Sequence, residues 1–403
     1  MNCRFCHNEL RHPFIDLVNS PPSNSYLTLE QLNEPETYYP LKVFVCDSCF
    51  LVQIDEYKKS ADIFNQDYAY FSSYSTAWLD HSRRYAHMII ERLNLDKNSI
   101  VMEIASNDGY LLQYFVEKEI PCYGIEPAEN AANVAREKGI TVLRSFFGNK
   151  MAHTLTKADL IIGNNVLAHV PDINSFVDGL RIALKPEGTI TMEFPHILNL
   201  INECQFDTIY HEHYSYLSLL TVDKIFRSNN LKIYDVEELP THGGSLRIYA
   251  THADSKIPYS KAVTDILAKE MGKKLNTLEG YLGLQSHANR IRLQFLGWIT
   301  EVHGRKDTIA AYGAAAKGNT FLNYCGIKGD MIQFIVDKSP HKQGKYLPGS
   351  HIPIVGIERI KEVKPRYILI LPWNIRDEIM AELSFVRSWY GIFVTAIPRL
   401  KLI

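Results

Sequence analysis

The densest run of ionisable side chains is Tyr210-His-Glu-His-Tyr-Ser-Tyr216, in the middle of the chain. A histidine beside a carboxylate can act as a general base with a fixed tautomer, and a tyrosine hydroxyl can donate to an oxygen that gains negative charge. If the run is extended, its tyrosines at 210 and 214 share a face with Glu212 and its histidines take the other. If it is turned, all can converge on one cleft. These residue types fit catalysis, an exposed polar loop and a fortuitous His-x-His metal pair equally well.

Four of the seven cysteines form two Cys-x-x-Cys pairs near the N-terminus, Cys3 with Cys6 and Cys46 with Cys49. In a reducing compartment, paired knuckles of this kind are typical of a structural zinc ion, with a redox dithiol as the alternative. The long gap between the pairs costs little, because the entropy of loop closure grows only logarithmically with length. We therefore expect a closed zinc site that folds residues 1–60 and takes no part in catalysis.

From residue 100 onward, short apolar runs alternate with helical patterns. This alternation predicts strands at 100–105, 122–127, 159–166 and 188–195, and helices at 110–119, 128–139 and 174–184. Before it, a strand is predicted at 41–45 and an amphipathic helix at 77–95. Such alternation is typical of a parallel sheet with helices on both faces, which binds ligands at the carboxyl ends of its strands. Residues 61–75 are interpreted as a loop.

A second α/β lobe is predicted after a helical region at 257–303, which we expect to bridge the two lobes. It begins with a strand, a Gly/Ala-rich turn and a helix at 308–318, and continues with strands near 332–337 and 367–372. Four large aromatic residues outside the motifs are interpreted as core: Trp78, Tyr249, Trp298 and Trp373.

Two strand ends in the first lobe carry residues suited to a nucleoside cofactor. The first strand runs from Glu103 into Ala105-Ser-Asn-Asp-Gly109, where small residues permit close approach and Asn107 or Asp108 can bind an amino or carboxylate group. The next strand ends at Glu126-Pro127, where a carboxylate can accept both ribose hydroxyls. The turn lacks a G-x-G-x-x-G set for a pyrophosphate, which favours S-adenosylmethionine over NAD; a purely structural turn is the third interpretation.

Further polar residues follow the other strand ends. Asn164 and Asn165 can contact the adenosyl or methionine part, and His169 lies about one helical turn further along.

Six motifs, in this order, resemble the zinc-containing sugar C-methyltransferases. They are Cys3-x-x-Cys6 with Cys46-x-x-Cys49, Tyr70-Phe-Ser-Ser-Tyr-Ser75, Glu103-Ile-Ala-Ser-Asn-Asp-Gly109, Tyr210-His-Glu-His213, Gly243-Gly-Ser-Leu-Arg247 and Tyr312-Gly-Ala-Ala-Ala-Lys-Gly318. The best-known members methylate C3 of nucleotide-linked 4-keto-deoxysugars. In that family the middle lobe holds S-adenosylmethionine, and the C-terminal lobe helps to hold the nucleotide sugar.

The resemblance implies an α/β fold with an N-terminal zinc-binding domain (1–60), a central Rossmann-like S-adenosylmethionine methyltransferase domain (61–255) and a C-terminal Rossmann-like α/β domain (256–403). It implies His213 as the base that removes the C3 proton, with Tyr210, Glu212 and His169 orienting it or stabilising the enolate. The expected cofactors are S-adenosylmethionine and structural Zn²⁺.

The binding residues expected from motifs and resemblance form two sets. The cofactor set is Tyr70, Ser72, Tyr74, Glu103, Ala105, Asn107, Asp108, Gly109, Glu126, Pro127, Asn164 and Asn165. The aromatic segment within that set is expected to form a flap, or else to pack statically. The substrate set is Gly243, Gly244, Arg247, Gly313 and Lys317, which offer backbone N–H groups and cations to a pyrophosphate. An ordinary β-turn and a ligand-free Rossmann turn are the alternatives for these two glycine motifs.

Composition limits the partners. The 403 residues are 46% hydrophobic and carry a net charge of −2, which excludes a disordered chain and argues against nucleic-acid binding. The N-terminus lacks a secretory signal and no apolar run is long enough to span a membrane, so we expect a cytoplasmic monomer with a nucleotide-linked ketosugar as its partner, no nucleic acid and no membrane. The competing hypotheses are an O- or N-methyltransferase acting on another small acceptor, and a non-catalytic zinc-ribbon interaction protein.

Overall fold

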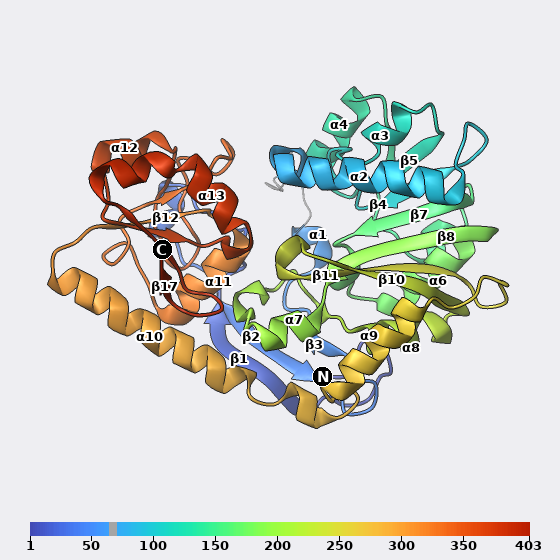
Figure 1. Ribbon diagram of the computed structural model, residues 1–403, viewed down its shortest axis with the longest axis horizontal. Helices are drawn as coiled ribbons and strands as arrows, with labels where there is room; N and C mark the ends of the chain where they lie inside the picture. The colour runs from blue at the N-terminus through green and yellow to red at the C-terminus, as the bar shows by residue number, and fades with distance from the viewer. Residues whose placement is uncertain (64–70) are drawn as a thin grey trace.

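The computed structural model describes residues 1–63 and 71–403 of the chain. Figure 1 shows the central α/β domain on one side and the C-terminal α/β lobe on the other, with the N-terminal strands along the base between them. The predicted fold class, mixed α/β with Rossmann-like lobes, is confirmed. Within the described ranges, no helix combines the length and the apolar character that a membrane span requires.

The N-terminal sheet takes its last strand from the middle of the chain. Its order is β1 (His12–Ser20), β2 (Tyr39–Val45), β3 (Val52–Ile54) and β9 (Ser215–Tyr216). β9 follows directly after the Tyr-His-Glu-His run, and it pairs antiparallel with β3 through Val52 opposite Tyr216. The zinc-binding region is therefore tied by a sheet to the segment that carries the candidate base.

The central sheet has the order β10-β11-β8-β7-β4-β5-β6, in which β11 runs antiparallel to both neighbours. Its strands are β4 (Val101–Ile104), β5 (Cys122–Ile125), β6 (Thr141–Leu143), β7 (Ala158–Asn164), β8 (Leu184–Pro195), β10 (Leu231–Leu239) and β11 (Ser245–His252). Its helices are α2 (Thr76–Leu93), α3 (Gln113–Val116), α4 (Glu129–Glu137), α5 (Asn149–Ala152), α6 (Ile173–Ala183), α7 (Ile197–Asn202) and α8 (Leu219–Ser228). The four predicted strands from 100 to 195 are confirmed. The helix predicted at 110–119 is shorter, because tight turns with i to i+3 hydrogen bonds replace its first part.

The C-terminal sheet is parallel except for its last strand, and its order is β14-β13-β12-β15-β16-β17. Its strands are β12 (Ile309–Tyr312), β13 (Ile335–Val336), β14 (Ile354–Val355), β15 (Tyr367–Ile370), β16 (Ile392–Thr395) and β17 (Lys401–Leu402), and its helices are α11 (Ala316–Cys325), α12 (Glu358–Val363) and α13 (Arg376–Glu382). The helical region predicted at 257–303 is two helices, α9 (Lys261–Gly272) and α10 (Leu284–Gly304). The helical pattern is interrupted between them, and α10 begins directly after Gly283, whose φ of 94° is a backbone conformation that favours glycine.

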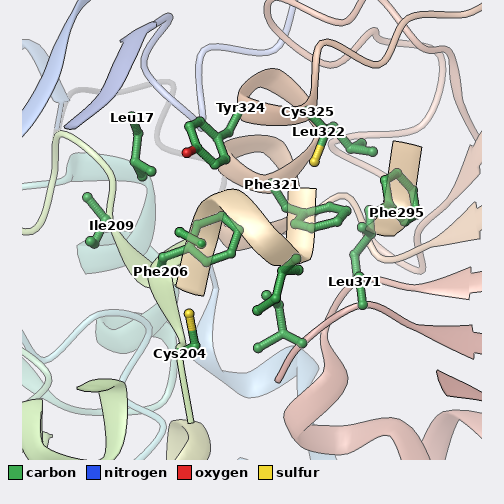
Figure 2. Packing of buried hydrophobic residues seen from close by; sticks show 14 of the residues in the cluster. Leu17, Cys204, Phe206, Ile209, Phe295, Phe321, Leu322, Tyr324, Cys325 and Leu371 are labelled. Carbon is green, nitrogen blue, oxygen red and sulfur yellow. The ribbon is translucent and has the colours of Figure 1, made fainter. Parts of the chain in front are cut away.

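One hydrophobic core joins all three parts of the chain. Figure 2 shows Leu17 of β1 and Ile209 of the central region on the side of Phe206 and Tyr324, and Phe295 of α10 beside Phe321 of α11. The Phe295 and Phe321 rings lie edge to face with centroids 4.8 Å apart. This packing fixes the segment that leads into the Tyr-His-Glu-His run against the C-terminal lobe.

The segment predicted as a loop at 61–75 contains two short helical turns, α1 (Ser60–Ile63) and η2 (Ser72–Tyr74). Residues 64–70 between them lie outside the described part of the chain.

Candidate active site

Four thiolates converge where the sequence predicts zinc. The Sγ atoms of Cys3, Cys6, Cys46 and Cys49 all lie within 4.8 Å of one another, and the Cys3–Cys49 and Cys6–Cys46 pairs are 3.5 Å apart. Tetrahedral zinc with bonds of about 2.3 Å separates its sulfur ligands by about 3.8 Å, so this arrangement fits the ion. Gln53 Nε2 donates to Cys3 Sγ at 3.1 Å and orients that ligand.

A cavity of about 480 Å³ opens where the three parts of the chain meet. It extends from the carboxyl ends of the central strands, past the Tyr-His-Glu-His run, to the N-terminus of α11. The predicted site residues that line it are Ser72, Ala105, Asn107, Glu126, Pro127, Asn164, Asn165, His169, Tyr210, Glu212, His213 and Lys317.

Glu126 is the acidic residue of the cofactor wall, at the end of β5. Its two carboxylate oxygens accept the backbone N–H groups of Asn107 at 2.9 Å and Ala128 at 2.8 Å, which hold the side chain at the cavity edge. Burial raises the pKa of Glu126 to about 7, although both backbone hydrogen bonds oppose the shift. The group is therefore an acceptor whose charge changes near neutral pH.

The end of the aromatic segment docks on the turn after β4. The backbone N–H of Ser72 donates to Asn107 Oδ1 at 2.9 Å, and that of Ser73 donates to Asp108 Oδ2 at 3.1 Å. Asp108 thus anchors this segment and does not line the cavity. Tyr70, which the sequence analysis also assigns to the cofactor set, lies outside the described residues.

Three other residues of the predicted cofactor set are not among those lining the cavity. Tyr74 is exposed, and its hydroxyl lies 3.1 Å from Nε2 of His341. Glu103 is buried in β4, where burial holds its pKa well above the usual range despite an interaction with Tyr110. Gly109 allows the turn to pack closely against Ile140, because a Cβ at this position would lie 2.4 Å from the Ile140 side chain.

The Tyr-His-Glu-His run is turned, not extended. The backbone N–H of His213 donates to the Tyr210 carbonyl at 3.0 Å, and the side chains of Tyr210, Glu212 and His213 all line the cavity. His211 points away, with Nε2 3.2 Å from the Pro40 carbonyl. Convergence on one cleft is thus confirmed for three of the four residues.

The tautomer of His213 follows from its two partners. Its Nδ1 lies 2.9 Å from the Thr208 carbonyl, which can only accept, so Nδ1 carries the proton. Nε2 is therefore the basic atom and accepts the Tyr210 hydroxyl at 2.7 Å. Burial and the adjacent His169, whose ring centroid is 4.7 Å away, hold the pKa of His213 well below its usual range. The ring is neutral at pH 7 and can take up a proton.

Glu212 and His169 complete this wall. Asn24 Nδ2 donates to Glu212 Oε1 at 2.7 Å, and His169 interacts with the Glu212 backbone. Burial raises the pKa of Glu212 to about 7, against the hydrogen bond from Asn24 and the charge of Lys58. Burial lowers the pKa of His169 to about 4, so this second imidazole is also neutral at pH 7.

Of the predicted substrate set, Lys317 lines the cavity. Its Nζ donates to Asn374 Oδ1 at 2.7 Å and lies 4.8 Å from the centre of the Trp373 ring. Burial lowers the pKa of Lys317, and the negative charge of Asp207 opposes that shift. The geometry leaves a buried cation at the end of the cavity nearest the C-terminal lobe.

The predicted glycines serve packing and do not line the cavity. A Cβ on Gly243 would lie 2.5 Å from the Trp373 ring, and one on Gly313 would lie 2.4 Å from Pro372. Gly244 is packed against Asn199 in the same way. The backbone N–H groups of Gly244 and Gly313 donate to the Thr241 and Val336 carbonyls at 2.9 and 2.7 Å.

Arg247 is likewise not part of the cavity wall; it forms a buried charge network in the central sheet. The Glu193 carboxylate of β8 accepts Arg247 at 2.7 Å, His81 of α2 at 2.9 Å and the Thr241 hydroxyl at 2.8 Å. Burial opposes ionisation of Glu193, but His81 and Arg247 outweigh it and lower the pKa to about 2. The guanidinium thus holds the sheet and the neighbouring loop together, and its expected role in binding substrate stays a prediction.

Several residues of the cavity wall are not identified by the sequence motifs. Trp78, interpreted as core, lines the cavity and stacks on His81 with centroids 4.9 Å apart. Trp373, also interpreted as core, is not among the lining residues and donates from Nε1 to Asp207 Oδ2 at 2.7 Å. Further additions include Asn24, Tyr26, His242 and Lys342. For the first two, the only signal is the polar stretch 20–26, which has no regular pattern.

Three family descriptions match successive parts of the chain. They are a zinc binding domain at residues 3–64, a methyltransferase domain at 78–236 and a C-methyltransferase C-terminal domain at 240–398. The C-methyltransferase NovU of Streptomyces niveus is 32% identical over 406 aligned positions, which cover 100% of this chain and 96% of NovU.

Two solved structures show more distant likeness. The magnesium protoporphyrin IX methyltransferase of Synechocystis PCC 6803, with bound SAH, is 16% identical at a TM-score of 0.37 and covers 43% of this chain and 83% of its own. The 1,6-didemethyltoxoflavin-N1-methyltransferase of Burkholderia thailandensis is 16% identical at a TM-score of 0.38 and covers 51% and 95%.

Proposed function

The chain belongs to the C-methyltransferase family, and on that premise we propose that it methylates C3 of a nucleotide-linked 4-keto-deoxysugar, with dTDP as the expected nucleotide. It is an S-adenosylmethionine-dependent enzyme with a structural zinc ion. The proposal depends chiefly on one observation: a neutral, hydrogen-bonded His213 lies in a cavity that reaches from the cofactor wall to the buried Lys317.

S-adenosylmethionine, when bound, supplies an electrophilic methyl group. We assign its ribose hydroxyls to Glu126 and its remaining polar groups to Asn107, Asn164 and Asn165. These side chains come from three neighbouring strand ends of one sheet, the place where open α/β sheets bind ligands.

The substrate must provide a carbon that can become a nucleophile. A ketone at C4 acidifies the C3–H bond, so removal of that proton yields an enolate whose C3 attacks the methyl group. We assign His213 Nε2 as the final proton acceptor. The Tyr210 hydroxyl occupies its hydrogen-bonding position, so the phenol relays the proton: its oxygen takes the C3 proton while its own proton passes to Nε2.

A base with a lowered pKa is weak, so the enolate needs stabilisation. We assign this role to the polar groups around His213, among them His169, because a partly buried site strengthens a hydrogen bond to a developing oxyanion. At the far end of the cavity, the Lys317 ammonium fits a negatively charged pyrophosphate. With the pyrophosphate of the substrate bound at the Lys317 end of the cavity and the methyl donor at the other end, the sugar ring lies beside His213.

The proton-transfer half of the reaction can be measured without turnover. With S-adenosylhomocysteine and a dTDP-4-keto-deoxysugar in deuterated buffer, we expect enzyme-dependent loss of the C3 proton signal by NMR. Replacing His213 by Asn should slow this exchange by about 10²- to 10⁴-fold, the usual contribution of a general base.

The matched control is His211→Asn, in the same turn but facing the Pro40 carbonyl, and it should exchange like the parent. If S-adenosylhomocysteine binds but no ketosugar exchanges its C3 proton, the C3 assignment is wrong, and an O- or N-acceptor becomes the better hypothesis. If exchange persists at the parent rate in His213→Asn, another group is the base.

A further inference from the structure

The segment between β1 and β2 leaves the zinc-binding region and crosses to the C-terminal lobe. Leu27 pairs with Tyr346 through two backbone hydrogen bonds of 3.0 and 2.8 Å. The Glu36 carboxylate accepts the backbone N–H of Gly349 at 2.8 Å and lies 3.0 Å from His351 Nε2. We call residues 21–38 the strap, because both its halves are fastened to the C-terminal lobe.

Just before the first of these fastenings, the strap enters the active-site cavity with two side chains, Asn24 and Tyr26. The Tyr26 hydroxyl lies 2.7 Å from the Ala314 carbonyl and 3.2 Å from Asn24 Oδ1. The Glu212 carboxylate can only accept, so the amide presents Nδ2 to it and Oδ1 to the Tyr26 hydroxyl. The hydroxyl shares its single proton between Oδ1 and the Ala314 carbonyl and so holds the amide in this orientation. Lys342 Nζ donates to the same Ala314 carbonyl at 3.0 Å and also interacts with the Tyr26 hydroxyl.

We propose that Asn24 and Tyr26 are positioning residues for methyl transfer: Tyr26 orients the Asn24 amide, and the amide holds the Glu212 carboxylate in the geometry that binds the sugar. The proposal deepens the proposed function and rests on it, because it takes Glu212 as a substrate contact. It assigns a part in the reaction to a segment that joins two strands of the zinc-binding region.

The chemistry of the amide explains why it is needed. Glu212 is almost fully buried and its partner is neutral, so its charge is stabilised chiefly by the Asn24 N–H, with Lys58 more distant. Tyr26 and Tyr214 also face it as titratable groups, and both are neutral at pH 7, while His169 interacts with its backbone. An N–H donor favours the ionised carboxylate, which can accept a sugar hydroxyl.

Asn24→Leu removes the donor and keeps most of the volume. A hydrogen bond to a charged group typically changes an equilibrium by about 10- to 100-fold, so we expect kcat/KM for the ketosugar to fall by about that factor. The acid limb of its pH profile should move to higher pH, because the ionised carboxylate loses its stabilising partner. The affinity for S-adenosylhomocysteine and the thermal midpoint should stay near the parent values. Tyr26→Phe should produce a smaller loss in the same direction, and Ser25→Ala, in the strap but not lining the cavity, should produce none.

Combining substitutions separates this inference from the function on which it rests. If Glu212→Gln lowers kcat/KM and Asn24→Leu adds little to it, the two residues act as one unit and the proposal is supported. If Glu212→Gln is impaired while Asn24→Leu keeps the parent rate and pH profile, the positioning role is overturned and the proposed function stands. If Glu212→Gln itself has no effect, the assignment of Glu212 falls, and this inference with it. A loss in Asn24→Leu with an equal loss of S-adenosylhomocysteine affinity and thermal stability would show a purely structural role, and would also overturn the proposal.

Discussion

Replacing Glu193 by Gln should destabilise the central domain strongly, although Glu193 lies away from the cavity. The carboxylate is fully buried and balances Arg247, whose side chain is only 4% exposed. Gln keeps the shape and some hydrogen bonds but removes the charge. The guanidinium is then left with Glu237, which is 3.3 Å away and 35% exposed.

The size of the effect can be worked out in two ways. Removing one member of a buried ion pair typically costs about 3–5 kcal/mol, because the other charge stays buried without compensation. Independently, the pKa of Glu193 is lowered from 4.5 to about 2 in the folded chain. That difference corresponds to about 3 kcal/mol of stabilisation of the ionised form. Since the folded pKa is the lower one, this contribution is present above pH 4.5 and is lost as the pH falls toward 2. Both routes predict a loss of about 3 kcal/mol at pH 7.

Urea unfolding of zinc-loaded protein at pH 7, followed by far-UV circular dichroism, measures this difference between parent and variant. Glu237→Gln is the matched control and should lose less than about 1 kcal/mol, since its charge is partly solvated. The double variant Glu193→Gln/Arg247→Met should recover stability relative to Glu193→Gln, because no unpaired charge remains. A loss below about 1 kcal/mol in Glu193→Gln would refute the argument that this pair is electrostatically coupled.

Two further predictions concern the metal and the cofactor. Removing zinc with a chelator should unfold residues 1–60 and abolish turnover, because β3 then no longer pairs with β9 beside the candidate base. Amide hydrogen exchange at Val52 and Ser215 measures the loss of this pairing, and full protection and activity after verified zinc loss would contradict the prediction. S-adenosylhomocysteine should bind more weakly as the pH falls below about 7, by up to tenfold per pH unit, because protonated Glu126 loses acceptor strength. Calorimetry should show this dependence of affinity on pH in the parent and not in Glu126→Gln. Equal dependence in both proteins would exclude Glu126 as the responsible group.

The sequence predicts those parts of this molecule that local patterns encode. The zinc ligands have a fixed spacing, and the parallel strands β4, β5, β7 and β8 are short apolar runs between helices, so both are confirmed. The sequence also identifies side chains at strand ends, such as Glu126, because β-strand direction places them at one edge of the sheet.

The sequence does not show the surroundings that long-range packing gives a residue. A glycine that opens a backbone to a phosphate and one that admits a tryptophan ring are identical in sequence, and Gly243 is of the second kind. Arg247 differs from an anion-binding arginine only by the buried carboxylate of Glu193, which is 54 positions away. Asn24 reaches Glu212 across 188 positions through a strap without regular structure, and no local pattern marks it.

The pairing of β3 with β9 has a practical consequence for engineering. Val52 and Gln53 pair with Tyr216 and Ser215, so the N-terminal region and the base-bearing turn share one sheet. A chimaera that takes only residues 1–60 from a relative would join two half-sheets whose registers have not been matched. Exchanging those residues together with 205–217 would transfer the strand pair, the strap and the turn that it contacts as one cassette. The natural unit for grafting in this enzyme is thus assembled in space and is discontinuous along the chain.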